Sequence, residues 1–222
     1  MGLIVALDSY ERASDVVRAT CGIVDGFKLG LPLLLEVGAE RALELRRFCS
    51  GAFWVADLKL ADIGHVMVAA ASRLVGGVDA IIAHSFVGVA GALEDLKLFL
   101  ESKSTKLILV VAMSHPGAAE LYEKLLDQIL DEVAPKVGPW GVVAPATRPE
   151  LVRLTRRKLG PSVKILSPGV GAQGAQPGSA LCAGADYEIV GRAITASEDP
   201  RRKAEAIRVA QGRALERCAG GA

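Results

Sequence analysis

The chain has 222 residues, of which 51% are hydrophobic and 23% are charged. This length supports one sizeable hydrophobic core and is short for two full domains, so we expect a single domain over residues 1–222. The 26 lysines and arginines nearly balance the 25 aspartates and glutamates, which excludes a global field that would attract nucleic acid or an anionic membrane. Any phosphate binding must therefore be local.

Hydropathy and composition also indicate where the protein works. No apolar run approaches the roughly 18 residues of a membrane span, and Asp8 interrupts the first apolar run too early for a signal peptide. We therefore expect a cytoplasmic protein without membrane contact. The chain has no asparagine and only four glutamines, a depletion typical of heat-adapted proteins, although a GC-rich genome would produce part of this bias. A thermophilic source is expected, and a mesophilic melting temperature would contradict it.

Short apolar runs rich in β-branched residues alternate with segments of helical periodicity, such as residues 35–49. Strands that are apolar throughout are buried on both faces, which indicates a parallel sheet covered by helices. Eight such units predict an α/β protein with the (β/α)8 TIM-barrel fold. A doubly wound open sheet is the alternative, and the tail at residues 218–222 is expected to fray. The expected strands are residues 3–8, 26–31, 53–59, 78–85, 106–113, 140–146, 163–169 and 187–193.

Polar residues gather at the ends of these expected strands. Asp8 ends the first strand, Lys28 lies late in the second, Asp57 and Lys59 end the third, and Ser114 follows the fifth. In (β/α)8 barrels the carboxyl ends of the strands form the reactive face. Because side chains alternate along a strand, Asp57 and Lys59 project to the same side, which we expect to be the barrel mouth.

Each of these charges also has a simpler structural interpretation. Asp62 could cap the helix that follows it, and Asp57 with Lys59 could form a structural ion pair at the rim. Burying charges is costly unless they are paired and hydrogen-bonded, and proteins usually accept that cost at functional sites. The segment DLKLADI at residues 57–63 is therefore the leading candidate for a functional site.

This segment matches the DxKxxDI signature of the orotidine 5'-phosphate decarboxylase family. Neighbouring segments resemble the same family in the same chain order, and the resemblance spans nearly the whole chain. A set of motifs in context is far more specific than any single motif. The glycine-rich segment SPGVGAQG is most similar to archaeal members. The matching segments are Asp8 in ALD, Lys28 in FKLG, MSHPG at 113–117, SPGVGAQG at 167–174 and VGRAI at 190–194.

The resemblance implies decarboxylation of orotidine 5'-monophosphate to uridine 5'-monophosphate, the last step of de novo pyrimidine nucleotide synthesis, with no metal and no cofactor. Loss of CO2 from C6 of the orotate ring leaves a carbanion that must be protonated. Lys59 would donate this proton, and its position between Asp57 and Asp62 would favour the ammonium form. Lys28 would orient Asp57 and reach a ribose hydroxyl, and Asp8 would bind the ribose too.

The resemblance also implies how the substrate is bound. The loops after the seventh and eighth strands are where barrels commonly place a phosphate, although their glycines could serve turn geometry alone. Gln173 and Arg192 would contact the phosphate, Ser114 would meet the pyrimidine as a loop closes, and Pro168 would pack near the ring. The implied substrate-binding residues are Asp8, Ile63, Ser114, Pro168, Gly169, Val170, Gly171, Gln173, Gly191 and Arg192.

The family places Asp62 and Ile63 in the site of the neighbouring subunit, so the resemblance implies a homodimer with shared sites. Val66 stands where many members have a threonine that reaches the ribose across the interface, so this chain lacks that hydroxyl. Two alternatives stay open. One is a Mg²⁺-dependent sugar-phosphate decarboxylase or aldolase of the same superfamily, which tends to carry glutamate at the position of Lys28. The other is a non-catalytic nucleotide-binding barrel.

The histidines and cysteines show no spacing typical of a metal site, and no metal is expected. His84 is expected to be a structural, hydrogen-bonding residue. Cytosolic cysteines are free thiols by default. However, Cys21 and Cys49 end the first and second expected helices, and Cys182 and Cys218 end the seventh and eighth. Disulfides 21–49 and 182–218 are therefore geometrically conceivable.

Overall fold

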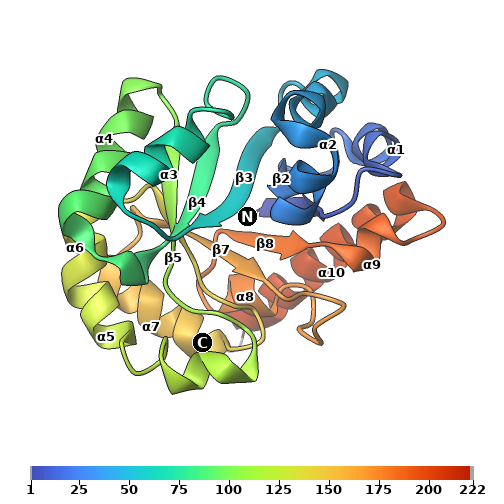
Figure 1. The fold of residues 1–222 in the computed structure, drawn as a ribbon. Helices are drawn as coiled ribbons and strands as arrows, with labels where there is room; N and C mark the ends of the chain where they lie inside the picture. Colours follow the sequence, from blue (N-terminus) through green and yellow to red (C-terminus); the bar gives the residue numbers. More distant parts are fainter. Residues whose placement is uncertain (1, 221–222) are drawn as a thin grey trace.

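Eight parallel strands form a closed ring in the computed structural model, which describes residues 2–220 (Figure 1). Each strand pairs with the next one along the chain, and β8 pairs with β1. This closure confirms the predicted (β/α)8 barrel. The alternative prediction of an open doubly wound sheet is wrong. The strands are β1 (Gly2–Leu7), β2 (Gly26–Gly30), β3 (Phe53–Leu60), β4 (Ala80–His84), β5 (Lys106–Val110), β6 (Gly141–Val143), β7 (Lys164–Pro168) and β8 (Tyr187–Val190).

The strands are buried because both of their faces are covered, as their apolar composition predicts. All six residues of β1 are buried. Phe27 on β2 and Trp54 on β3 are in register, and their ring centroids lie 4.9 Å apart. Such packing fixes the strands as rigid supports for the polar side chains at their carboxyl ends.

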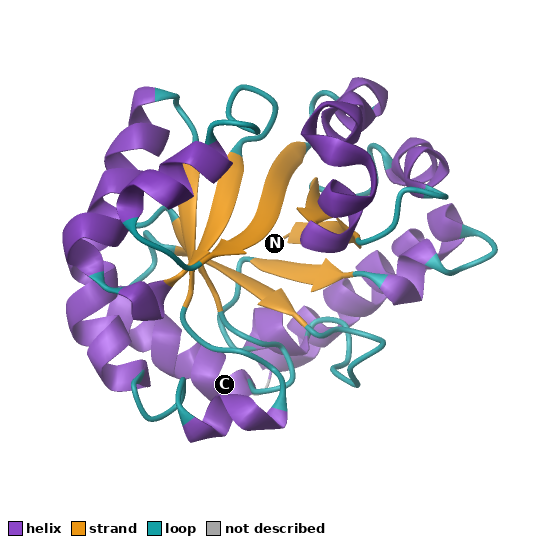
Figure 2. Ribbon diagram, viewed as in Figure 1, coloured by secondary structure: helices purple, strands orange, loops and turns teal. Residues whose placement is uncertain are grey.

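Helices surround the ring of strands on its outside (Figure 2). The longer helices are α1 (Ala13–Thr20), α2 (Leu31–Leu43), α3 (Gly64–Ala71), α4 (Glu94–Ser102), α7 (Pro149–Leu159) and α10 (Pro200–Gly220). The shorter ones are α5 (Leu126–Gln128), α6 (Ala134–Val137), α8 (Ser179–Cys182) and α9 (Arg192–Thr195). Single turns of other helix types are η1 (Glu44–Phe48), η2 (Ser85–Val87), η3 (Val89–Leu93), η4 (Pro116–Glu120) and η5 (Ile129–Val133). Within residues 2–220, no helix is both long enough and apolar enough to cross a membrane.

Two expected boundaries differ from the structure. The helix expected over residues 35–49 begins at Leu31 as α2, loses helical geometry at Gly38 with φ of 77°, and gives way to η1 after Leu43. Glycine adopts this left-handed conformation at little cost, so it marks a kink that periodicity alone conceals. The tail expected to fray is helical as far as Gly220, and residues 221–222 lie outside the described residues.

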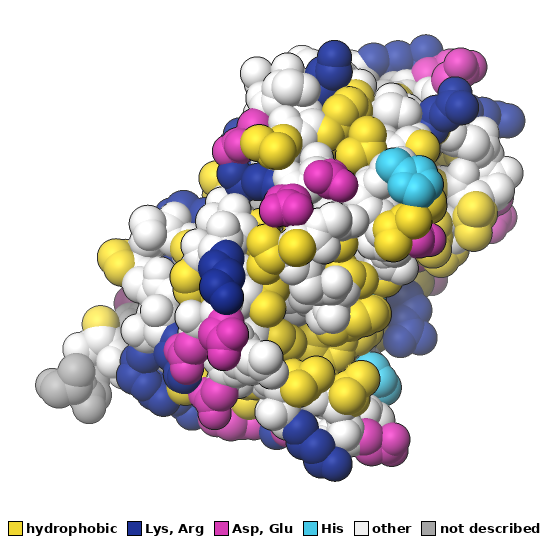
Figure 3. Space-filling model, turned by 60° about the vertical axis from the view of Figure 1, so that its left-hand side comes forward, with side chains coloured by type: hydrophobic (Ala, Val, Ile, Leu, Met, Phe, Trp, Pro, Cys, Tyr) yellow, Lys and Arg dark blue, Asp and Glu magenta, His cyan; other side chains and the backbone are white. Residues whose placement is uncertain are grey.

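The surface carries charges of both signs. On the face shown in Figure 3, acidic and basic side chains are interspersed, and hydrophobic side chains gather between them. This distribution agrees with the near balance of 26 basic and 25 acidic residues in the sequence. The face therefore presents no extended basic patch of the kind that binds nucleic acid through its backbone.

Both conceivable disulfides are formed in the structure. Cys21, directly after α1, is bonded to Cys49, directly after η1, with 5.6 Å between their Cα atoms. Cys182 at the end of α8 is bonded to Cys218 in α10, with a Cα separation of 6.0 Å. Both separations lie within the range that a disulfide can bridge. The two bonds therefore join neighbouring elements of the helical layer.

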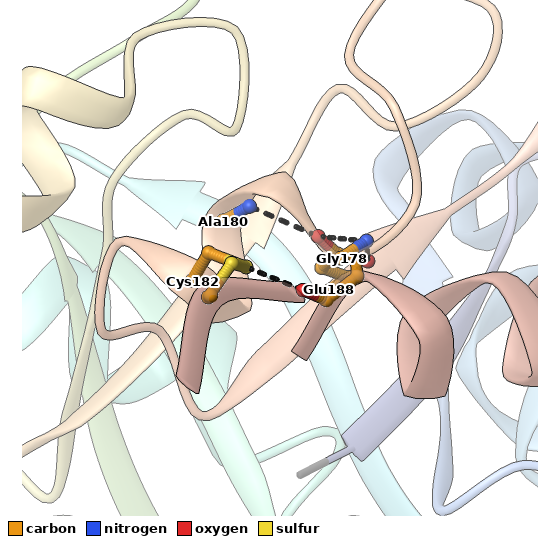
Figure 4. The surroundings of a disulfide bond; sticks show 6 residues. Gly178, Ala180, Cys182 and Glu188 are labelled. Carbon is orange, nitrogen blue, oxygen red and sulfur yellow. Dashed lines mark hydrogen bonds between the residues drawn. A yellow bond between two sulfur atoms is a disulfide. The ribbon is translucent and has the colours of Figure 1, made fainter. Parts of the chain in front are cut away.

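A buried carboxylate lies beside the second disulfide (Figure 4). Glu188 on β8 is fully buried and accepts hydrogen bonds from the backbone N–H groups of Gly178 and Ala180, at 2.8 to 3.1 Å. Gln211 Nε2 on α10 also donates to Glu188, at 2.9 Å. Gly178 has φ of 91°, and a Cβ there would lie 2.3 Å from the Cβ of Ala214. This network fixes the end of the β7–α8 connection against α10.

Candidate active site

A cavity of about 430 Å³ lies at the carboxyl ends of the strands. This is the face on which (β/α)8 barrels build their sites. The cavity brings together ten of the residues implied by the family resemblance, which come from five different strands or the segments after them. These residues are Asp8, Lys28, Asp57, Lys59, Pro168, Gly169, Val170, Gln173, Gly191 and Arg192.

Two lysines share one carboxylate oxygen of Asp57 in this cavity. Lys59 Nζ lies 2.7 Å from Asp57 Oδ2, and Lys28 Nζ lies 3.0 Å from the same oxygen. Lys28 Nζ also lies 3.4 Å from Asp8 Oδ1. β2 and β3 are neighbours in the ring, so strand pairing places these charges side by side. The result is an alternating array of carboxylates and ammonium groups.

Burial and charge act in opposite directions on this array. Burial alone would lower the pKa of Lys28, but the Asp57 and Asp8 carboxylates outweigh it and raise the pKa above 10.5. Burial alone would raise the pKa of Asp57, but the ammonium groups of Lys28 and Lys59 lower it below 3.8. Lys28 and Asp57 therefore stay charged at neutral pH. Asp57 Oδ1 is buried and has no hydrogen-bond partner among the described residues.

The backbone at Lys59 is in an uncommon conformation that the sequence did not predict. Lys59 has φ of 46°, and the register between β3 and β4 shifts between Ala56 and Leu60. A non-glycine residue with positive φ stores strain, which proteins tend to keep at functional sites. Nothing in the residue pattern around Lys59 signals this geometry, because lysine has no special preference for it. The side chain nevertheless lines the cavity beside Asp57.

The glycine-rich connection after β7 forms the other side of the cavity. Gly169 has φ of 112°, and a Cβ there would come within 3.1 Å of Thr147 Cγ2 and 3.2 Å of Gln173 Oε1. Gly171 does not line the cavity; its added Cβ would lie 2.8 Å from the Cβ of Ala193. These two glycines thus permit close packing that a side chain would prevent. Arg192 follows Gly191 and supplies a positive charge to this side.

Apolar residues that the family resemblance did not point to form a further part of the wall. Ile82, Val110, Val143 and Ile189 come from β4, β5, β6 and β8 and line the cavity. Their strands were expected, and strand alternation could have placed them. They give the cavity a low-polarity wall, which strengthens the electrostatic interactions inside it.

Besides Gly171, three implied site residues lie outside the cavity. Asp62 and Ile63 are exposed on the connection after β3, and Ser114 is exposed on the connection after β5. Asp62 Oδ1 accepts a hydrogen bond from the N–H of Ile63 at 2.7 Å, whereas α3 begins at Gly64 without a side-chain cap. Asp62 is therefore not the cap of this helix. Among the described residues of one chain, Asp57 is the carboxylate that pairs with Lys59.

His84 at the end of β4 is hydrogen-bonded, as its position in the sequence led us to expect. Its Nδ1 lies 2.5 Å from the hydroxyl oxygen of Tyr122. Within residues 2–220, no group of three or more histidine, cysteine, aspartate or glutamate side chains is arranged to hold a metal ion.

The fold and the site define a class: a (β/α)8 barrel whose mouth holds a lysine–carboxylate array, a glycine-rich loop after β7 and an arginine after β8. Comparison with known proteins identifies its family. Residues 1–207 match the model of the orotidine 5'-phosphate decarboxylase / HUMPS family. The chain belongs to this family.

Similar proteins agree with this membership. The orotidine 5'-phosphate decarboxylase of Aeropyrum pernix is 52% identical over 205 residues, which cover 89% of this chain and 83% of the relative. That of Thermococcus kodakarensis is 42% identical and covers 92% of this chain and 94% of the relative. The crystal structure of orotidine 5'-monophosphate decarboxylase from Sulfolobus solfataricus superposes with a TM-score of 0.89 at 36% identity, covering 96% of this chain and 98% of that one.

Proposed function

We infer that this chain decarboxylates orotidine 5'-monophosphate to uridine 5'-monophosphate. The observation that carries this inference is the sharing of Asp57 Oδ2 by Lys28 and Lys59 within the cavity of a chain that belongs to this family. Relatives that share 40 to 52% of its residues carry the name of this enzyme. The activity is that of a carboxy-lyase.

The array suits a reaction in which negative charge develops on carbon. The bond between C6 and the carboxylate carbon breaks, CO2 leaves, and the electron pair stays on C6. We propose that the Lys59 ammonium stabilises this developing charge and then transfers a proton to C6. Asp57 would lie beside the substrate carboxylate, and Lys28 would hold Asp57 in place. Because these groups are already fixed by one another, the site needs little reorganisation during the reaction.

The far side of the cavity offers groups for the phosphate and the ribose. We propose that Arg192 and Gln173 contact the phosphate with the backbone around Gly169 and Gly191, and that Asp8 and Lys28 bind ribose hydroxyls. Contacts with a phosphate distant from C6 can supply binding energy that closes loops around the reacting ring. Ser114 would reach the pyrimidine after such a closure, since it is exposed outside the cavity.

The Lys59→Ala variant tests the proposed function. Decarboxylation of orotidine 5'-monophosphate is followed by ultraviolet absorbance in the presence of EDTA. We expect turnover by the wild type and a loss of at least about a thousandfold in the variant, because proton donation and charge stabilisation are both removed. Lys136→Ala, a change of an exposed lysine on α6, is the matched control and should keep full activity.

The same assay separates the two alternatives. A Mg²⁺-dependent sugar-phosphate decarboxylase or aldolase would lose activity in EDTA and would ignore the pyrimidine nucleotide. Lys28 disfavours it, because an ammonium at that position repels a divalent cation. A non-catalytic nucleotide-binding barrel would bind the nucleotide without turnover. Absence of turnover by the folded wild type would therefore contradict the proposed function.

We further propose that the active form is a homodimer in which Asp62 and Ile63 enter the partner's site. Ile63 and Val66 support this arrangement, because they are 54% and 39% exposed beside the cavity-lining end of β3. Val66 has no hydroxyl, so it would contribute an apolar contact where a threonine would reach the ribose. The cytoplasmic location expected from the sequence is part of the proposal, and fractionation of the source cells would test it.

A further inference from the structure

Tyr122, in the connection between β5 and α5, is a buried aromatic residue whose role the proposed site does not explain. This connection carries Ser114, which must move toward the cavity to reach a substrate. Leu121 near the end of the connection is 58% exposed, whereas the next residue, Tyr122, is only 7% exposed. A buried aromatic side chain thus holds the part of the connection that precedes α5.

The contacts of Tyr122 join it to two neighbouring strands at the barrel mouth. Its hydroxyl oxygen lies 2.5 Å from His84 Nδ1 at the end of β4. The same oxygen lies 3.4 Å from the carbonyl oxygen of Val110 at the end of β5. Ser85 Oγ also donates to this carbonyl, at 2.6 Å. Tyr122 is therefore held by groups that belong to the rigid ring of strands.

Aromatic packing holds the same group in place. The ring of Phe86 lies 4.9 Å from the ring of His84 and 5.8 Å from that of Tyr122, between centroids. Such offset and edge contacts favour a fixed geometry among the three rings. Removing the Tyr122 hydroxyl alone would leave this packing intact, so the hydrogen bond can be tested separately from the rings.

His84 also lies close enough to the charged array to respond to it electrostatically. Burial and the positive charge of Lys59 lower the pKa of His84, while the negative charge of Asp57 acts in the opposite direction. The neutral imidazole has one nitrogen that accepts a hydrogen bond, and Nδ1 can accept the proton of the Tyr122 hydroxyl. β4 lies between β3, which carries Lys59, and β5, which leads to Ser114. His84 thus lies on the strand between the array and the connection that carries Ser114.

We propose that His84 and Tyr122 are positioning residues for the decarboxylation. Their hydrogen bond fixes the far end of residues 111–121, so that Ser114 closes over the cavity in one geometry. Neither residue touches the substrate in this role; both act through the connection that carries Ser114. The inference rests on the proposed function, because that function supplies the reason for Ser114 to enter the cavity.

Tyr122→Phe tests the inference most directly. We expect kcat/KM for orotidine 5'-monophosphate to fall about fivefold, the factor that corresponds to the net free energy of one hydrogen bond. The melting temperature should stay close to that of the wild type. Tyr187→Phe is the matched control, because Tyr187 begins β8 at the opposite end of the barrel and should leave kcat/KM unchanged.

A double-mutant cycle with Ser114→Ala shows whether Tyr122 acts through the connection. If it does, Tyr122→Phe causes almost no further loss in the Ser114→Ala background. An equal, additive loss in both backgrounds would overturn the inference. His84→Ala should reproduce the loss, and His84→Asn should restore most of it, because the asparagine amide lies near the position of Nδ1. A folded His84→Asn protein that restores nothing would also contradict the hydrogen-bonding role.

Amide hydrogen exchange of the ligand-free protein gives a readout that needs no turnover. We expect residues 113–121 to exchange faster in Tyr122→Phe than in the wild type, because one end of the connection is released. If the wild type proves inactive and exchange is still faster in Tyr122→Phe, the proposed function is rejected and the anchoring is retained. If the wild type is active and Tyr122→Phe exchanges no faster than the wild type, the anchoring alone is rejected.

Discussion

Asp57 concentrates the electrostatics of the site in a single oxygen atom. Oδ2 receives both lysines, at 2.7 and 3.0 Å, while Oδ1 is buried without a partner among the described residues. Lys28 is nearly buried with a side-chain exposure of 10%, whereas that of Lys59 is 42%. The less exposed lysine is thus suited to fixing Asp57, and the more exposed one to reaching the substrate.

His84 gives a prediction about pH at the same scale. Its pKa in the folded protein lies below the ordinary value of 6.5, so the unfolded chain binds more protons as the pH falls below about 6.5. The contribution of His84 to the free energy of unfolding is therefore present above that pH and is lost on acidification. Chemical denaturation gives the free energy of unfolding at about pH 7.5 and at about pH 5. The decrease in this free energy between the two pH values should be smaller for His84→Asn than for the wild type.

His115→Asn is the control for this measurement, because His115 is exposed on the connection after β5. The free energy of unfolding of the His115→Asn variant should depend on pH in the same way as that of the wild type. An equal pH dependence in the wild type and in His84→Asn would contradict the shift assigned to His84.

At the scale of elements, the disulfides join segments on the face of the barrel opposite the cavity. Cys21 and Cys49 each follow a helical segment and precede a strand. In this fold, connections from a helix to the next strand lie at the amino ends of the strands. Cys182 ends α8, and Cys218 belongs to α10, which also holds Gln211 against Glu188. The covalent bonds thus restrain the helical layer without touching the cavity.

Reduction of both disulfides should lower stability without lowering activity at moderate temperature. The bonds close segments separated by 28 and 36 residues in sequence. Loop-entropy estimates for such lengths give about 3–4 kcal/mol for each bond. We expect a reducing agent to lower the denaturation midpoint of the wild type. The Cys49→Ser/Cys218→Ser variant should have a midpoint below that of the oxidised wild type, and the reducing agent should not change it. Titration of four thiols in unreduced, denatured protein would contradict the disulfides themselves.

At the scale of the whole molecule, we propose that a second chain completes the site. Asp62 lies outside the cavity, and the apolar side chains of Ile63, Val66 and Phe86 are 54%, 39% and 49% exposed. Exposed apolar residues grouped around a functional site are typical of a surface that another protein covers. A second copy of this chain is the partner that we propose.

Mixing two inactive variants tests this arrangement. Lys59→Ala lacks the proposed proton donor of its own site, and Asp62→Ala lacks the carboxylate that we propose it lends to its partner. Random reassociation makes half of the dimers mixed, and one of their two sites is intact, so about a quarter of wild-type activity should return. Sedimentation of each variant and of the mixture must show that the protein is dimeric. Failure of the mixed dimers to regain activity would reject shared sites.

The sequence by itself determined the class of fold and the identity of the charged residues. Eight apolar runs separated by helical segments leave few alternatives to a closed parallel sheet, because each run must bury both faces. The spacing of Asp57 and Lys59 pointed to the mouth for the same local reason. Both conclusions depend on short-range periodicity, which a sequence contains in full.

Only the tertiary structure decided the geometry in which these residues meet. The sharing of Asp57 Oδ2, the positive φ of Lys59, and the bond between His84 and Tyr122 join different elements or depend on a shift in strand register. The two disulfides became definite for the same reason, since bonding depends on distances across helices that no spacing in sequence fixes. Contacts between distant residues arise from packing of the whole barrel, and local pattern does not contain them.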